Sequence, residues 1–492
     1  MAHTKAPKGI FTIKSRIAAT PLPVFVIVLG LAGCTVGPDF RSPAPPDVTR
    51  YTATPVAKLT TSAPTPLGES QQLVKGLPIN VQWWRNLGSP ALDRLIEEAF
   101  QASPTLAAAR ATLHQSQELH AAQAGSTQYP QVDAGLGAQR QRFNPGALGQ
   151  SGDAREFNLY NTSVGVRYSL DLVGGNRRAL EALAARVDYR HFELKATMQT
   201  LAGNIATTAI TRARIAAQME ATSAIASAQK EQLDLTRERV RIGQASPDEV
   251  LGLQAQMEQT RAELPALSKQ LQQADHLLAI LTGRAPGAAH TPAFKLTDFT
   301  LPAKLPLIVP SELVHRRPDI QAAEALLHEA NANYGVSVAK LYPQLNLSAS
   351  LGSQSLTTDA LFGGGSAVWS LVGQLTQPLF NPGLPAEKRA SLAAFDAAAA
   401  NYRSVVLESL RNVADNLSAV ENDAQTLRAL ASATAATQSS LESVERQYQF
   451  GSASYVQLLI AQQQIQQTRI GLTAAQAQRL LDSVALYQAM GT

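Results

Sequence analysis

The 492-residue sequence predicts an α+β membrane protein whose β-strands are too few to close a barrel within one chain. Three observations support this fold class. Four segments alternate apolar and polar residues with the period of a β-strand, and two proline-free stretches have the length of very long helices. The order of these elements also occurs twice along the chain, which indicates an internal duplication.

The four alternating segments lie at residues 129–141, 158–172, 344–355 and 367–377. The first three place apolar side chains on one face and polar or small ones on the other, whereas the fourth has Val368 and Val372 on its polar side. Each has about ten residues or more, the length that a tilted strand needs to cross a bilayer. A soluble antiparallel sheet would show the same alternation, so the pattern alone leaves both environments open.

Four strands that cross a membrane need partners from other copies of the chain. An open sheet edge in lipid leaves backbone groups unpaired, at a cost of several kcal/mol each. Two copies would give eight strands with a filled interior, whereas three would give twelve strands and room for a pore. The loops at residues 142–157 and 356–366 carry glycine and polar residues, as the extracellular loops of barrels do.

The two long stretches run from Arg177 to Ile242 and from Ala386 to Phe450. At 1.5 Å per residue, each would be about 100 Å long as one helix, or two arms of half that length. In the second stretch, apolar or small residues recur at spacings of three and four, which is typical of a coiled-coil seam. The seam positions are Leu392, Phe395, Ala399, Tyr402, Val406, Leu410, Val413, Leu417 and Val420. An all-helical bundle would leave the four strands unexplained.

The internal duplication rests on landmarks that recur in the same order. Each half is expected to begin a helix at a proline, to end its long helix at a glycine and to cap the next helix with a serine. The corresponding pairs are Pro104 and Pro318, Gly243 and Gly451, and Ser246 and Ser454. We therefore assign one structural repeat to residues 81–285, a linker to residues 286–309 and a second repeat to residues 310–492.

The N-terminal residues 1–33 have the pattern of an export signal, with four basic residues before an apolar run. The run ends at Leu31-Ala32-Gly33-Cys34, which resembles the bacterial lipobox, where the signal is removed and the cysteine receives a diacylglycerol. Cys34, the single cysteine of the chain, is therefore the predicted lipidation site. Thr35 in place of aspartate favours the outer membrane, by resemblance to the sorting rules of such lipoproteins. Residues 34–80, rich in proline, threonine and serine, predict an extended tether.

Charge and motif content exclude several classes of function. The net charge of +4 disappears once residues 1–33 are set aside, because 38 basic and 38 acidic residues remain. A nucleic-acid partner is not expected, since phosphate binding needs a net basic surface. The eight histidines form no cluster at metal-ligand spacing, and Gly363-Gly364-Gly365 lacks the Lys-Ser/Thr of a phosphate loop. No nucleophile has a base partner, so we predict neither a cofactor nor enzymatic activity.

The sequence resembles the TolC-like outer-membrane efflux factors, in particular their lipoprotein branch of RND-type, NodT-like proteins. The most specific element is the run Pro310-Ser311-Glu312-Leu313-Val314-His315-Arg316-Arg317-Pro318-Asp319-Ile320, followed by Ala323-Glu324. Supporting segments are Val36-Gly37-Pro38-Asp39-Phe40, Trp83-Trp84, Tyr168-Ser169-Leu170-Asp171-Leu172-Val173-Gly174 and Gln377-Pro378-Leu379-Phe380-Asn381. The similarity extends from about Trp83 to Gly491 and so covers nearly the whole mature chain.

The resemblance implies a homotrimer with a twelve-stranded outer-membrane β-barrel, a long periplasmic α-helical barrel and a mixed equatorial belt formed partly by the chain ends. It implies the passive exit duct of a tripartite efflux system, opened at its periplasmic tip by an adaptor and an inner-membrane pump. Rings of carboxylates close that tip in the family, and Val413-Ala414-Asp415-Asn416-Leu417 is similar to the family's segment near it.

Asp415 is therefore the candidate periplasmic gate residue, with a solvated surface carboxylate as the alternative. The alternative for the whole chain is a structural lipoprotein that bridges the periplasm without forming a channel.

Overall fold

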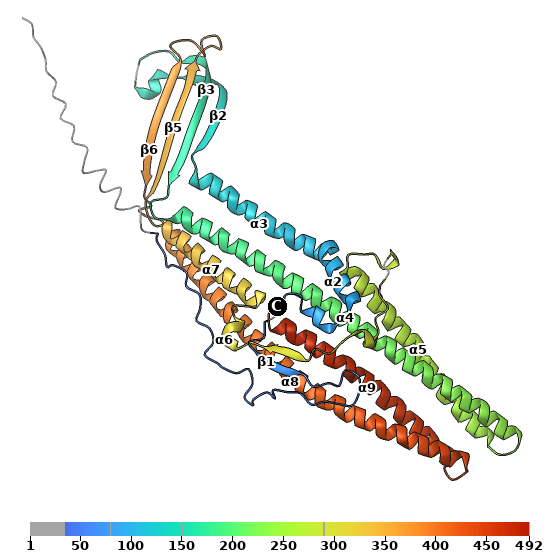
Figure 1. Cartoon of the computed structure of the whole chain (residues 1–492). Coiled ribbons are helices and arrows are strands. Elements are labelled where there is room, and N and C mark those ends of the chain that lie inside the picture. The colour runs from blue at the N-terminus through green and yellow to red at the C-terminus, as the bar shows by residue number, and fades with distance from the viewer. Residues whose placement is uncertain (1–34, 79, 150, 289–290, 492) are drawn as a thin grey trace, which may run out of the picture. The chain divides into compact units, whose positions relative to one another are not determined.

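The computed structural model describes residues 35–78, 80–149, 151–288 and 291–491 (Figure 1). The chain divides into two compact units. The first contains the described residues within 1–38, 124–179 and 333–389, and the second those within 39–123, 180–332 and 390–492. Cys34 and the predicted export signal lie outside the described residues.

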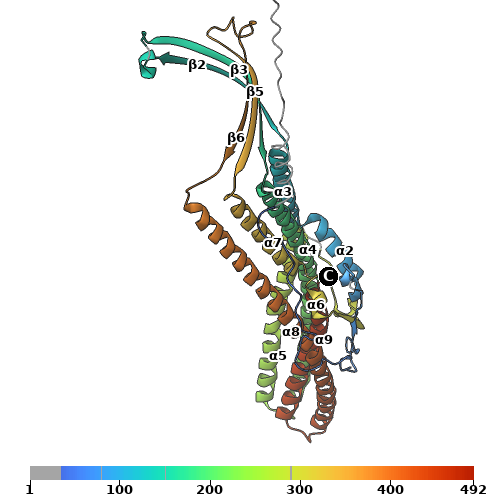
Figure 2. The same ribbon diagram turned by 90° about the vertical axis from the view of Figure 1, so that its left-hand side faces the viewer.

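The first unit is built around a four-stranded antiparallel sheet with the strand order β2-β3-β5-β6 (Figure 2). The strands are β2 (Gln131–Phe143), β3 (Arg155–Leu170), β5 (Gln344–Ser355) and β6 (Ala367–Thr376). The sequence predicted four strands per chain, and each begins within three residues of its predicted start. A short helix, η2 (Pro145–Leu148), interrupts the first predicted loop.

The helices and strands follow the duplicated order that the sequence predicts. The first repeat consists of α3 (Pro104–Gln128), β2, β3, α4 (Gly175–Arg241) and α5 (Pro247–Leu281). The second consists of α7 (Pro318–Ala339), β5, β6, α8 (Gly383–Gln449) and α9 (Tyr455–Ala489). The long helices α4 and α8 have 67 residues each, and α5 and α9 have 35 each. Each long stretch is thus one continuous helix, about 100 Å in length.

In the part of the chain that the structure describes, no helix combines the length and the apolar character needed to span a membrane.

The second unit contains a small parallel sheet that pairs β1 (Gln72–Lys75) with β4 (Lys304–Leu307). β1 lies inside the segment predicted as an extended tether, so the structure differs from that prediction. The reason is that this segment has partners: the Thr60 amide donates to the Gln71 carbonyl over 2.9 Å, and both residues are buried. A segment whose backbone amides and carbonyls are hydrogen-bonded can form regular structure, even where its composition is typical of a linker.

The core of the second unit lies where the helical hairpins α4–α5 and α8–α9 pack against short elements. These are η1 (Trp83–Leu87), α2 (Pro90–Ala102), η4 (Leu296–Asp298) and α6 (Pro310–Leu313), whereas η3 (Pro286–Ala288) is exposed. Trp83 is fully buried and stacks on Tyr487 of α9, with ring centroids 5.6 Å apart. The predicted seam of α8 is buried at Tyr402 and at most positions as far as Val420, whereas Leu392 is exposed.

Candidate functional site

The strand register places the predicted apolar residues on one common face of the sheet. Two rows of side chains cross all four strands: Ala134, Val164, Leu351 and Trp369, and next to them Val132, Val166, Ala349 and Leu371. Five large members of this face, Val132, Leu136, Leu351, Trp369 and Leu371, are 64–81 % exposed. Nothing within the described chain covers this face, so a single copy leaves a large apolar surface uncovered.

The opposite face of the sheet is polar. Arg167 of β3 pairs with Asp133 of β2 at 2.6 Å, and the hydroxyls of Ser350 and Ser370 are hydrogen-bonded at 2.9 Å. Val372 is directly opposite Ser348 on this polar face, as the irregular alternation of the fourth segment predicts. Among the described residues, the outer edges of β2 and β6 have no partner strand. The sheet therefore has one face suited to lipid, one suited to water and two open edges.

Both helical hairpins end in the same local structure. Gly243 and Gly451 adopt φ values of +78° and +71°, a left-handed conformation that favours glycine after a helix end. Ser246 and Ser454 then form the N-caps of α5 and α9, as predicted. Both caps are capping boxes, in which the cap amide donates to a side chain of the first turn, at 3.3 Å to Glu249 and 2.7 Å to Gln457.

The two hairpin ends lie side by side, as both views show (Figures 1 and 2). The Tyr448 hydroxyl near the end of α8 donates to Glu249 of α5 over 2.9 Å, and the Arg239 guanidinium lies 4.9 Å from the Tyr448 ring centroid. Burial and the hydrogen bond to Glu249 raise the pKa of Tyr448. A small apolar cluster continues the contact, formed by Leu233, Leu253 and Met257 with Val250, Tyr455 and Leu459 packed against it.

Sequence reasoning missed Tyr448, Glu249 and Arg239 as a group. The available signal was their position within one or two turns of the helix ends that Gly243 and Gly451 mark. Their mutual contact depends on the packing of one hairpin against the other, which the periodicity of each helix does not determine.

The hairpin ends also expose apolar side chains. Leu251 of α5 and Val456 and Ile460 of α9 are 60–65 % exposed, and the last two are one helical turn apart. From Tyr455 to Thr468, α9 contains no charged residue. Two polar links thus join the hairpins near this end, Tyr448 to Glu249 and, about two helical turns into α9, Gln462 to Gln232 of α4. The first half of α9 presents an uncharged, partly apolar surface.

Asp415 lies in the middle of α8, 34 residues before its end at Gln449, which corresponds to about 50 Å. The prediction that it lies near the end of the helical region is therefore wrong. Val413 and Leu417, on either side of it, are buried in the main core of the second unit. Asp415 itself is 62 % exposed and pairs with Arg411 at 2.8 Å.

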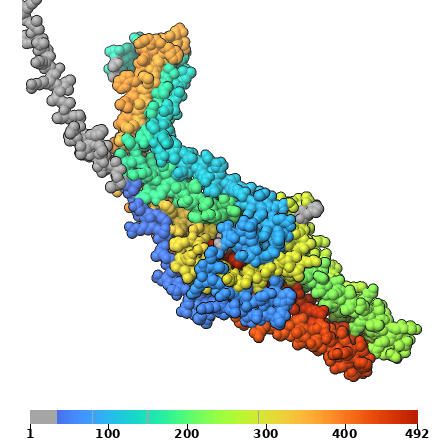
Figure 3. All heavy atoms as spheres, in the orientation of Figure 1, coloured from blue at the N-terminus to red at the C-terminus, as the bar shows by residue number. Residues whose placement is uncertain are grey.

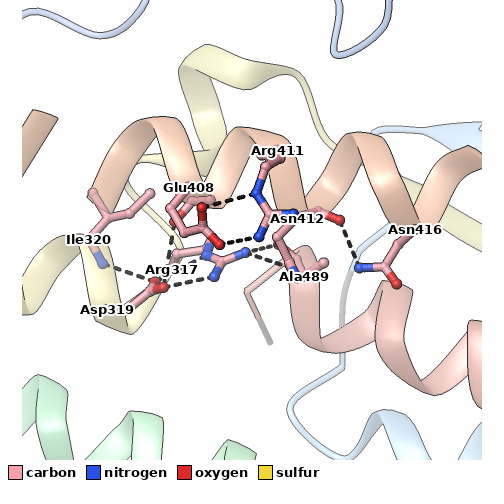
Figure 4. A network of polar contacts seen from close by, with 9 residues as sticks. Arg317, Asp319, Ile320, Glu408, Arg411, Asn412, Asn416 and Ala489 are labelled. Atoms are coloured by element: carbon pink, nitrogen blue, oxygen red, sulfur yellow. Dashed lines mark hydrogen bonds and ion pairs between the residues drawn. The ribbon is translucent and has the colours of Figure 1, made fainter. Parts of the chain in front are cut away.

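The signature residues Arg317 and Asp319 lie near this part of α8 and have a structural role (Figure 4). Arg317 pairs with Asp319 at 2.7 Å and donates to the Ala489 carbonyl at 3.0 Å and to the Asn412 side chain at 3.3 Å. The Asp319 carboxylate also accepts from the Ile320 amide at 2.9 Å. The motif therefore joins the start of α7 to α8 and to the last turn of α9.

Two buried ionisable side chains, Arg479 and Asp482, lie in the C-terminal part of α9. Arg479 is fully buried and donates to the Gln71 side chain at 2.8 Å and to the Glu69 carbonyl at 3.2 Å. Asp482 is 4 % exposed and accepts from Gln478 at 2.8 Å. Burial raises the pKa of Asp482 to about 7, and the nearby Asp423 carboxylate acts in the same direction. This cluster fixes the N-terminal segment onto α9.

No group of three or more histidine, cysteine or acidic side chains in the described ranges could hold a metal ion.

Comparison with known proteins gives consistent matches over most of the chain. The family model described as "Outer membrane efflux protein" matches residues 95–284 and 309–492. The pyoverdine export outer membrane protein OpmQ of Pseudomonas putida is 30 % identical over 83 % of this chain and 87 % of its own length. The toluene efflux pump outer membrane protein TtgI of the same species is 28 % identical over 96 % of this chain and 97 % of its own length.

Solved structures show the same fold. The outer-membrane channel OprN aligns with a TM-score of 0.84 and 25 % identity, over 93 % of this chain and 99 % of OprN. The open-state MtrE outer membrane channel of Neisseria gonorrhoeae aligns with a TM-score of 0.80 and 24 % identity, over 93 % of this chain and 98 % of MtrE.

The matches confirm the resemblance seen in the sequence, and with it the predictions of an efflux function, an outer-membrane location and a non-enzymatic conduit. Two separate blocks of the chain match the family model; the first contains α3 to α5 and the second α7 to α9. This chain belongs to the outer membrane efflux protein family.

Proposed function

We propose that this protein is the outer-membrane channel subunit of a tripartite efflux system and that it works as a passive homotrimeric exit duct. The observation that carries the proposal is a four-stranded sheet with an uncovered apolar face and two unpaired edges. Each unpaired backbone group within lipid costs several kcal/mol, so the edges need strands from sibling chains. Three copies supply twelve strands, which leave room for a pore.

In this proposal, the hairpins α4–α5 and α8–α9 of three copies form the periplasmic wall of the duct. The link between Tyr448 and Glu249 keeps neighbouring hairpin ends together. A periplasmic adaptor and an inner-membrane pump would open the duct there, by separating hairpins that only a few contacts join. Asp415 contributes a charged ring at the level of mid-α8 rather than at the hairpin ends.

We also propose that Cys34 carries the lipid that anchors the mature chain to the outer membrane. The support is the sequence Leu31-Ala32-Gly33-Cys34 after an apolar run and the absence of any second cysteine from the sequence. Within the second unit, the N-terminal segment lies beside the C-terminal helices, where Arg479 of α9 donates to the Gln71 side chain (Figure 3).

The test combines fractionation with conductance and uses Cys34→Ser in the full-length chain. A barrel keeps the variant in the outer-membrane fraction without its lipid, because twelve strands hold it there. The purified wild type should have the mass of a trimer and conduct ions in planar bilayers. A water-soluble monomeric variant, together with a wild type that does not conduct, would support the structural periplasm-bridging lipoprotein instead.

A further inference from the structure

We propose that a cavity on the second unit binds an amphiphilic anion, meaning a single acyl chain with a carboxylate or phosphate head group. The cavity has a volume of about 490 Å³, within the usual range for small-molecule sites. Its walls come from residues 49–58, from β1, from Leu307 at the end of β4 and the three residues after it, and from Leu417 of α8. All of these residues belong to the second unit, whereas the proposed barrel is built from the sheet of the first unit. Ligand binding can therefore be tested independently of channel activity.

The interior of the cavity is apolar. Leu73, Ile308 and Leu417 are at most 8 % exposed and form its floor, and Val56 and Leu307 are half-buried beside them. An alkyl chain placed here would cover apolar surface that water now contacts, at about 25 cal/mol per Å². The floor therefore suits a hydrocarbon chain better than a polar metabolite.

The rim of the cavity is cationic. Arg50, Lys58 and Lys75 line it, and none of the three has an ion-pair partner in the described part of the chain. No aspartate or glutamate is among the lining residues. Glu312 acts electrostatically on Tyr51, a lining residue, but is already paired with Arg316 at 2.6 Å. Three unpaired cations with no acid at an apolar cavity favour an anionic head group over a neutral or cationic one.

An unpartnered polar atom in the wall supports the same ligand class. The Tyr51 hydroxyl is buried and has no hydrogen-bond partner in the described structure. A buried hydroxyl without a partner destabilises a protein, and a carboxylate or phosphate oxygen would accept a hydrogen bond from it. The cavity thus combines an apolar lining, three basic side chains at its opening and one hydroxyl that can donate a hydrogen bond to the ligand.

The experiment uses full-length protein in a neutral maltoside detergent, with the fluorescence of dansyl-undecanoic acid as the probe. We expect saturable binding, and displacement by dodecyl phosphate at a concentration at least tenfold lower than by dodecanol, which lacks the charge. Lys58→Gln and Lys75→Gln should each weaken binding about two- to fivefold. Val74→Trp, which narrows the cavity, should weaken it further.

The matched control is Lys304→Gln on β4, since Lys304 pairs with Gln72 in the register but does not line the cavity. Its binding should equal that of the wild type. Laurate and a lysophosphatidylglycerol, compared as competitors, distinguish a free fatty acid from a membrane lipid as the source, and displacement by either supports the site. Equal displacement by dodecanol, or equal loss in Lys304→Gln and Lys58→Gln, would overturn the proposal.

Discussion

At the scale of single residues, the buried carboxylate of Asp482 makes stability depend on pH. Its pKa is raised from 3.8 to about 7, so the folded state retains the proton more tightly than the unfolded chain. The stability contributed by the neutral acid is complete below pH 3.8 and is lost as the pH rises toward 7. Each unit of pKa difference corresponds to about 1.4 kcal/mol, which sets an upper limit of a few kcal/mol.

We therefore expect Asp482→Asn to flatten the pH dependence of the unfolding temperature between pH 4 and 8. The variant should gain most over the wild type at pH 8, where the wild-type carboxylate is charged and buried. Thermal unfolding followed by circular dichroism measures this. Asp234→Asn, which removes a carboxylate that is 54 % exposed, serves as the control. An unchanged slope in Asp482→Asn would contradict the assignment.

Tyr448 is the residue whose change should affect closure of the duct most directly. Tyr448→Phe removes the hydroxyl that donates to Glu249, a hydrogen bond to a charged group worth about 1.5–3 kcal/mol. We expect higher conductance in planar bilayers, because the hairpin ends separate more easily.

Glu258→Gln is the matched control for Tyr448→Phe, since its partner Arg261 lies on the same helix and joins no hairpins.

Asp415→Ala should raise the leak or alter cation preference through the mid-helix ring. If Asp415→Ala raises conductance and Tyr448→Phe does not, closure lies at mid-α8 rather than at the hairpin ends.

At the scale of elements, the helix caps contribute to the local stability of the hairpin ends. Ser454→Ala removes the side chain that accepts from the Gln457 amide, which typically costs about 1 kcal/mol. The loss should appear as faster amide hydrogen exchange in the first turns of α9, without a change in global fold. Ser246→Ala should behave alike, because the duplication repeats the same capping box. Ser440→Ala, at an exposed position inside α8, should leave exchange unchanged or slower.

The elements also show where local sequence information was sufficient. Pro104 and Pro318 begin α3 and α7, as predicted. Gly243 and Gly451 follow the ends of α4 and α8, and a serine caps the helix after each of them. These signals are local because each residue acts on the backbone next to it. β1 was not predicted, since its strand character comes from pairing with β4, more than 200 residues away. Composition alone gave Gln72–Lys75 no signal for that pairing.

At the scale of the whole molecule, the open sheet predicts how assembly fails. Leu371→Arg places a charge on the apolar face, which costs about 2–4 kcal/mol near the middle of a bilayer. We expect loss of the detergent-resistant trimer in gel electrophoresis. Ser370→Arg, one residue earlier and on the polar face, should assemble normally. Equal assembly of both variants would mean that the apolar face does not meet lipid.

The sequence by itself determined the features that depend on local periodicity. The period of two set the strands, the long proline-free stretches set α4 and α8, and the repeated landmarks set the order of elements in both halves. Only the tertiary structure decided which distant side chains meet. It placed Asp415 in mid-helix, joined Tyr448 to Glu249 and buried Asp482 beside Arg479, because contacts between helices depend on how whole faces pack.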